Sequence, residues 1–174
     1  HVAALGKNAV ILGSKSGFAS VQEDLEKALA DAGVKFHYER FMGECSRKEI
    51  DRVNAVVKAH GGDVVLAVGG GKCIDAGKAV AHENKVPVVV VPTIASTDAP
   101  CSALAVTYTD DHVFESYYVL PQNPNLVVVD TEVIARCPAR FLVSGMGDAL
   151  ATWFEADACR KSRAKNLPGG DSTE

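Results

Sequence analysis

The chain has 174 residues, a formal net charge of −4 and 47% hydrophobic residues, the composition of a soluble globular protein that can bury its own core. Acidic residues outnumber basic ones and no basic run is present, so we do not expect nucleic acid as a partner. No apolar stretch reaches the length of a membrane span. The five cysteines are widely spaced without a CxxC pair, which favours reduced thiols in a cytoplasmic protein over a disulfide framework.

The first part of the chain alternates between predicted strands and predicted helices. Asn8–Leu12 is an apolar run closed by a glycine, and apolar residues at helical spacing follow over Ala19–Ala32. Val34–Phe41 alternates as a strand does, and Ser46 predicts the start of the next helix, with Glu49 as its partner in a capping box. The elements predicted next are that helix up to Gly61-Gly62, a strand over Val64–Val68, a helix over Lys72–His82 and a strand over Val86–Val91.

Strands that alternate with helices in this way predict an α/β fold. We expect a Rossmann-like, open and mostly parallel sheet with right-handed crossovers and helices on both faces. Beyond Pro92 we expect an inserted β-hairpin, a further strand and a long helical pattern interrupted at SGMGD: Ala103–Tyr108 with Phe114–Leu120, Asn125–Asp130, and Ala139–Lys161. The α/β domain is expected to span residues 1–161, and a polar, turn-rich tail follows over 162–174.

A glycine-rich turn lies between the third predicted strand and the helix that follows it, in AVGGGKCIDAGKAVA. Such turns bring backbone N–H groups and the positive end of a helix against an anion, most often phosphate. Gly70 and Gly71 leave room for the anion because a Cβ would hold it off, and Lys72 adds a positive charge. The pattern fits neither GxGxxG nor the phosphate loop of nucleotide hydrolases, and the alternative is a plain strand–helix turn with a solvated lysine.

The segment VPTIASTDAPCSAL follows the next strand, so we expect it at the carboxyl end of the sheet, where ligands of open α/β folds bind. The hydroxyls of Thr93, Ser96 and Ser102 and the carboxylate of Asp98 suit a polar ligand. The same residue types also collect in ordinary loops for their turn geometry. Composition alone leaves both interpretations open.

Four segments together resemble the N-terminal half of bacterial-type glycerol dehydrogenases: GGGKCIDAGKAVA, VPTIASTDAPCSAL, NPNLVVVDTEVIA and PARFLVSGMGDALATWFEADAC. That family belongs to the metal-dependent, iron-containing alcohol dehydrogenases, and the resemblance extends from Asn8 to Gly170. It implies an NAD-dependent, zinc-assisted transfer of hydride from glycerol, with dihydroxyacetone as product, in a homo-oligomer. It also implies that an all-helical, metal-binding domain follows the tail in the family, and that this chain ends before that domain.

The resemblance implies roles for individual residues, none of them catalytic in the strict sense. Gly70, Gly71 and Lys72 match the turn that takes the NAD diphosphate. Asp98 matches the carboxylate that binds the substrate hydroxyls, and Asp148 matches the one zinc ligand that this half of the family's chain supplies. Contacts to the nicotinamide and its ribose are implied for Thr93, Ser96, Ser102, Leu104 and Tyr108.

From the residues alone, Asp148 has two interpretations. Gly145 and Gly147 interrupt the helical pattern just before it, as the close approach of a ligand requires. An aspartate at such a point is also an ordinary helix N-cap.

Two departures from the family pattern change what we expect. Ser14, in ILGSKS, stands where the family has an acidic residue that reaches the adenosine ribose, and with Lys15 beside it the discrimination against a 2′-phosphate is weakened. The two histidine zinc ligands of the family belong to the helical domain, and none of the five histidines of this chain has a matching context. Because catalytic zinc usually has three protein ligands, we expect these residues alone to leave the metal site incomplete.

Two functions therefore stay open. The first is an NAD-dependent glycerol dehydrogenase present as a truncated N-terminal domain, or another metal-dependent polyol dehydrogenase of the same superfamily. The second is a stand-alone NAD-binding module without turnover. In either case we expect the chain to expose the apolar face on which the helical domain docks, and hence to self-associate.

Overall fold

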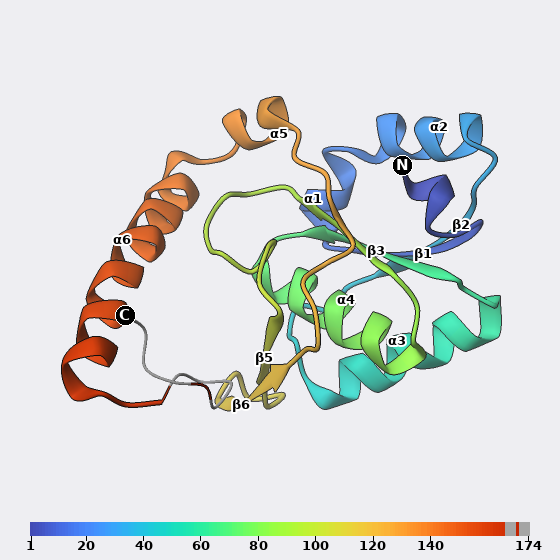
Figure 1. Ribbon diagram of the computed structural model, residues 1–174. Coiled ribbons are helices and arrows are strands. Elements are labelled where there is room, and N and C mark those ends of the chain that lie inside the picture. Colours follow the sequence, from blue (N-terminus) through green and yellow to red (C-terminus); the bar gives the residue numbers. More distant parts are fainter. Residues whose placement is uncertain (166–169, 171–174) are drawn as a thin grey trace.

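Five parallel strands form the central sheet of the computed structural model, which describes residues 1–165 and 170 (Figure 1). Their order is β2-β1-β3-β4-β7, so the chain adds β2 on one side of β1 and the remaining strands on the other. The strands are β1 (Asn8–Gly13), β2 (Lys35–Arg40), β3 (Val64–Gly69), β4 (Val88–Pro92) and β7 (Leu126–Val127). The predicted Rossmann-like, mostly parallel sheet is confirmed.

Helices cover both faces of this sheet (Figure 1). One layer holds η1 (Val2–Ala4), α1 (Lys15–Ala19) and α2 (Gln22–Asp31), and the other holds α3 (Arg47–His60) and α4 (Gly71–Asn84). The strands supply two hydrophobic clusters, because successive side chains of a strand point to opposite faces. In β1, Ile11 belongs to the cluster of Phe18 and Leu29, whereas Leu12 belongs to that of Ile50 and Ile74.

The helix predicted over 19–32 is present as α2, which begins three residues later than predicted, and a separate short helix, α1, precedes it. α1 ends at Ala19, where the Ser20 hydroxyl donates to the Gly17 carbonyl at 2.7 Å. Val21 then leaves the helical region with φ −127° and ψ 0°, and α2 begins at Gln22. A serine side chain that bonds to a nearby carbonyl competes with the helical ladder, and this local bond is what the apolar spacing did not reveal.

The predicted capping box at the start of α3 is half formed. The Ser46 hydroxyl accepts the backbone N–H of Glu49 at 3.4 Å, as a helix N-cap does. The Glu49 carboxylate turns away, accepting the N–H of Met42 at 2.9 Å and pairing with Arg52. Glu49 therefore holds the loop before α3 as well as its own helix.

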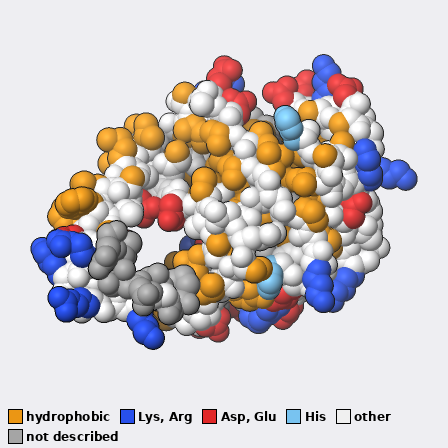
Figure 2. Space-filling view, in the orientation of Figure 1, with side chains coloured by type: hydrophobic (Ala, Val, Ile, Leu, Met, Phe, Trp, Pro, Cys, Tyr) orange, Lys and Arg blue, Asp and Glu red, His pale blue; other side chains and the backbone are white. Residues whose placement is uncertain are grey.

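The C-terminal part of the described chain leaves the sheet. After β7, which is shorter than the strand predicted over 125–130, come α5 (Thr131–Ala135) and α6 (Ala139–Ser162). The predicted interruption of α6 at SGMGD is wrong, because both glycines stay in one continuous helix. Large hydrophobic side chains lie exposed along α6 (Figure 2). Most of the predicted tail, residues 166–169 and 171–174, lies outside the described residues. Among those that are described, no helix combines the length and apolarity needed to cross a bilayer.

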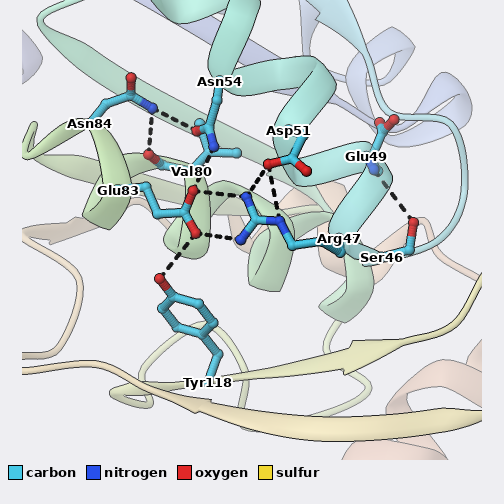
Figure 3. A network of polar contacts seen from close by, with 9 residues as sticks. All are labelled: Ser46, Arg47, Glu49, Asp51, Asn54, Val80, Glu83, Asn84 and Tyr118. Carbon is cyan, nitrogen blue, oxygen red and sulfur yellow. Dashed lines mark hydrogen bonds and ion pairs between the residues drawn. The ribbon is translucent and has the colours of Figure 1, made fainter.

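The inserted hairpin is confirmed as the antiparallel pair of β5 (Leu104–Tyr108) and β6 (Phe114–Val119). A polar network joins it to the α3–α4 layer (Figure 3). Glu83 of α4 accepts two hydrogen bonds from Arg47, at 2.6 and 2.9 Å, and one from the Tyr118 hydroxyl at 3.1 Å. The pKa of Glu83 is lowered to about 2, and the hydrogen bonds from Arg47 are the largest cause, so the carboxylate stays charged at neutral pH.

Candidate functional site

The strand order places a topological switch point, a candidate ligand-binding position, between β1 and β3. From β1 the chain crosses to β2 on one side, whereas the connection from β3 leads to β4 on the other, so the two loops diverge at the carboxyl edge. Open α/β folds bind ligands at such a switch point. Here Ser14 follows β1 and the glycine turn follows β3. A cleft of about 430 Å³ lies between them, and residues 40–43, at the end of β2 and just after it, form part of its lining.

The glycine turn is built for close approach. Gly69 has a φ of +157°, and a Cβ there would lie 2.7 Å from the Ser14 hydroxyl oxygen. On Gly70 and Gly71 a Cβ would meet the side-chain ends of Ile94 and Thr97, at 2.8 and 2.9 Å. Gly70 is the N-cap of α4 and has no side chain to bond the first amides of the helix. Those N–H groups are therefore left for an anion in the cleft, with the positive end of the helix dipole behind them.

Lys72 lines the same cleft and is held by an ion pair. Its Nζ lies 2.6 Å from Glu44 Oε2 and 4.7 Å from the centre of the Tyr108 ring. His112, from the hairpin turn, approaches the same carboxylate oxygen through Nδ1 at 2.5 Å. Burial disfavours the charged form of Glu44, but hydrogen bonds from His112 and Lys72 outweigh it and lower the pKa of that carboxyl. The Lys72 side chain is nevertheless 47% exposed, so the alternative of a solvated surface lysine stays open for it.

A cysteine also borders the cleft, but it is not a nucleophile. Cys73, in the first turn of α4, is buried and directs its Sγ to the Leu12 and Val68 carbonyls, at 3.4 and 3.5 Å. Burial raises the pKa of its thiol to about 12. The Cys73 thiol is therefore neutral at physiological pH.

The loop predicted to face the ligand is fastened to the turn. The N–H of Thr93 donates to the Gly69 carbonyl at 3.0 Å, and the Thr93 carbonyl accepts from Cys137 Sγ at 2.7 Å. Further along, Ser102 and Leu104 direct oxygens to the buried ammonium of Lys78 on α4. Of the predicted cofactor contacts, only Ser14 and the turn residues line the cleft itself. Thr93 is bonded to the end of β3, and Ser102 and Leu104 are bonded to the middle of α4.

The structure brings Asp98 and Asp148 together. Asp148 Oδ2 accepts the backbone N–H of Asp98 at 3.0 Å. α6 can come this close because residue 145 is a glycine. A Cβ there would stand 2.3 Å from the Ala95 carbonyl oxygen and 3.4 Å from the Ser96 Cα. The N-cap interpretation of Asp148 is wrong, since the residue lies in the middle of α6. Across the described ranges, no three His, Cys, Asp or Glu side chains are grouped as a metal requires.

Sequence reasoning missed the wall opposite the glycine turn. Arg40, Phe41, Met42 and Gly43 line the cleft, and Glu44 holds Lys72. The signal was available, because this segment follows a strand paired in parallel with β1 and so emerges at the same edge of the sheet. Lys78 was missed as well, because its helical spacing resembles that of a surface lysine.

Comparisons with known proteins agree with this geometry. The iron-containing alcohol dehydrogenase family matches residues 1–131, well over half of the chain. The chain belongs to this family. A glycerol dehydrogenase from Escherichia coli is 48% identical over 170 residues, which cover 98% of this chain and 46% of the relative. A glycolaldehyde reductase from Halobacterium salinarum is 44% identical over 173 residues, covering 99% of this chain and 47% of that protein.

The chain also resembles a solved structure, that of a probable glycerol dehydrogenase from Sinorhizobium meliloti. The TM-score is 0.85 at 47% sequence identity, and the match covers 97% of this chain and 45% of that one. The chain thus spans about half the length of the relatives that it matches.

Proposed function

We propose that the chain is the dinucleotide-binding part of an NAD-dependent glycerol dehydrogenase. The observation that carries the proposal is the glycine turn: uncapped amides at the start of α4, with no Cβ on Gly70 or Gly71, face a cleft at the β1/β3 switch point. The diphosphate of NAD binds at Gly70, Gly71 and Lys72, because backbone N–H groups and a lysine complement its charge. Glu44, which now pairs with Lys72, releases the ammonium to the phosphate.

The two ends of the dinucleotide lie on opposite sides of this turn. The adenosine occupies the cleft beside Ser14, and the nicotinamide extends toward the loop that carries Asp98. Thr93, Ser96, Ser102, Leu104 and Tyr108 line the nicotinamide and its ribose. When bound, NAD supplies the acceptor for a hydride from the substrate carbon. Asp98, which is exposed at the end of its loop, orients the substrate by accepting hydrogen bonds from two adjacent hydroxyls.

We propose Asp148 as one ligand of a catalytic metal. The family's name specifies iron, whereas the metal proposed here is zinc. The described residues do not by themselves fit a catalytic metal. Asp148 offers one carboxylate, whose Oδ2 already accepts the Asp98 N–H, and nitrogen donors are not grouped with it in the described part of the chain. We therefore derive no step through the metal here.

Glycerol is the proposed substrate, in a cytoplasmic homo-oligomer, because the matched relatives include glycerol dehydrogenases at about half identity. The test uses the complete polypeptide that contains residues 1–174, assayed for NAD reduction with glycerol, ethanol and lactate. We expect turnover with glycerol at least tenfold above the other two, since only a vicinal diol offers Asp98 two hydroxyls. Equal rates of NAD reduction with glycerol and ethanol would contradict the proposal, and so would the absence of NADH binding in a separate titration.

A further inference from the structure

The helix that begins at the glycine turn carries a lysine in the protein interior. The side chain of Lys78 is 0% exposed, and its Nζ forms an ion pair with Asp75 Oδ1 at 2.9 Å. Asp75 lies one turn earlier on α4 and is itself buried. A buried ion pair is weak evidence of stabilisation, because removing both charges from water offsets their attraction. The pair therefore calls for a reason other than stability.

The partners of this pair lie in one segment, residues 99–106. Lys78 Nζ donates to the Ala99 carbonyl at 2.9 Å, to the Ser102 carbonyl at 3.3 Å and to the Leu104 carbonyl. Asp75 Oδ2 accepts the backbone N–H of Val106 at 3.2 Å. Lys78 Nζ also donates to the Ser102 hydroxyl at 3.3 Å, but the other contacts reach backbone atoms, so they fix the path of the chain and not merely one side chain.

The segment held in this way joins the two parts of the proposed site. It begins beside Asp98 and runs through Ser102 and Leu104 into β5. The glycine turn stands at the start of the same helix, about two turns before Lys78. A shift of the segment relative to the turn changes the distance between the diphosphate site and the nicotinamide side.

We infer that Lys78 and Asp75 are positioning residues, which hold the segment 99–106 at a fixed distance from the glycine turn so that both ends of one dinucleotide are bound together. This inference rests on the proposed function. The pair touches neither the cofactor nor the substrate; it acts through the backbone that it anchors.

The experiment compares two ligands that share a diphosphate. ADP reaches the glycine turn and the adenosine side, whereas NADH also needs the anchored segment. In Lys78→Met, which keeps the length of the side chain, we expect the Kd for NADH to rise by on the order of tenfold or more. The Kd for ADP should stay within about twofold, because the turn does not depend on the segment.

Glu83→Gln provides the matched control. Glu83 lies on the same helix and also ties it to the hairpin, but it accepts from the Tyr118 side chain and not from the backbone of residues 99–106. Its loss therefore weakens the fold while the backbone contacts of Lys78 and Asp75 stay in place. We expect both Kd values of this variant to stay within about twofold of the parent. If Lys78→Met does not fold, Asp75→Asn replaces it; the amide oxygen still accepts the Val106 N–H while the ammonium loses its counter-charge.

The outcomes separate the inference from the proposed function. A parent chain that binds neither ADP nor NADH overturns the proposed function. A parent that binds both, with variants at Lys78 and Asp75 that leave both Kd values unchanged or raise them equally, overturns the positioning role. A selective loss of NADH affinity supports it.

Discussion

Gly70 shows at the scale of one residue how the site depends on a missing side chain. Its φ of −93° is open to any residue, and an added Cβ would meet only the flexible end of Ile94. We therefore predict that Gly70→Ala changes the free energy of unfolding by less than about 1 kcal/mol. Its affinity for NADH should fall on the order of tenfold, because the methyl group enters the cleft where the diphosphate approaches. Fluorescence titration with NADH and urea unfolding measure the two quantities.

Gly147→Ala is the control for that substitution. A Cβ on Gly147 would meet no atom within 4 Å, and the residue lies on α6, away from the turn. Its NADH affinity should match that of the parent. Gly70→Ala with undiminished NADH affinity would mean that the dinucleotide does not bind at the turn.

The side chains beside the turn bear on the choice of cofactor. Ser14, Lys15 and Arg40 line the cleft, and no acidic side chain is among its lining residues in the described chain. A carboxylate at this position repels a 2′-phosphate, whereas cations accept it. We predict that the Kd for NADPH lies within about tenfold of that for NADH, and that Ser14→Asp raises the NADPH value selectively. A strict NADH preference in the parent chain would contradict this.

The Glu83 network gives a prediction of pH dependence. Its pKa is about 2 in the folded protein and near 4.5 in the unfolded chain. A lowered carboxyl pKa contributes stability above pH 4.5, and this contribution is lost as the pH falls from there toward 2. Glu83→Gln should lower the free energy of unfolding by about 1 to 2 kcal/mol at pH 7, since the network is partly open to solvent. In urea titrations, the difference in the free energy of unfolding between variant and parent should be smaller at pH 3 than at pH 7. An equal difference at both pH values would contradict this prediction.

Single residues of the site could be predicted from the sequence where their role depends only on the local backbone conformation. Gly70 and Gly71 were identifiable because the sequence places glycines where a strand meets a helix. The ion pair of Lys72 with Glu44 was not, because it joins residues 28 positions apart. Neither was the burial of Lys78, which depends on carbonyls that only the folded loop directs toward it.

At the scale of elements, the two glycines of α6 have different surroundings, and substitutions at them should have opposite effects on the stability of the helix. A Cβ on Gly145 would clash with the backbone oxygen of Ala95 at 2.3 Å, whereas Gly147 has open space around it. Gly147→Ala should stabilise α6 by about 0.5 to 1 kcal/mol, because alanine loses less backbone entropy. Gly145→Ala should push α6 from the loop and cost about 1 to 3 kcal/mol.

Amide hydrogen exchange measured along α6 checks both substitutions. We expect slower exchange in Gly147→Ala and faster exchange in Gly145→Ala than in the parent chain. The same direction of change in both variants would show that the contact with Ala95 does not hold α6 to the loop.

Helices and strands could be predicted from the sequence best where residues close in sequence determine them. The buried strands β1, β3 and β4 are continuous apolar runs, as strands covered on both faces are. The break between α1 and α2 comes with one serine hydrogen bond, and α6 contacts a loop about 50 residues earlier in the chain. Neither feature can be predicted from the spacing of hydrophobic residues in the sequence.

At the scale of the whole molecule, α6 stands out from the sheet with an unburied apolar face (Figures 1 and 2). Its large hydrophobic side chains, each at least half exposed, follow helical spacing: Leu142, Val143, Met146, Leu150, Trp153 and Phe154. Exposed apolar stripes of this extent drive association. We predict that the 174-residue chain self-associates in sedimentation velocity, and that Leu150→Glu with Trp153→Glu reduces the association. A monodisperse monomer at all concentrations would contradict this.

The overall fold was the most predictable level, since alternating strands and helices allow few topologies. What the sequence could not reveal is how far α6 stands from the sheet, because its apolar pattern is that of any helix that packs on a core.

The position of the diphosphate is the most direct test of the binding mode. A crystal structure of the chain with NAD should show phosphate oxygens against the backbone N–H groups at Gly71 and Lys72, with the nicotinamide on the Asp98 side. Electron density for NAD at any other place on the sheet would contradict it.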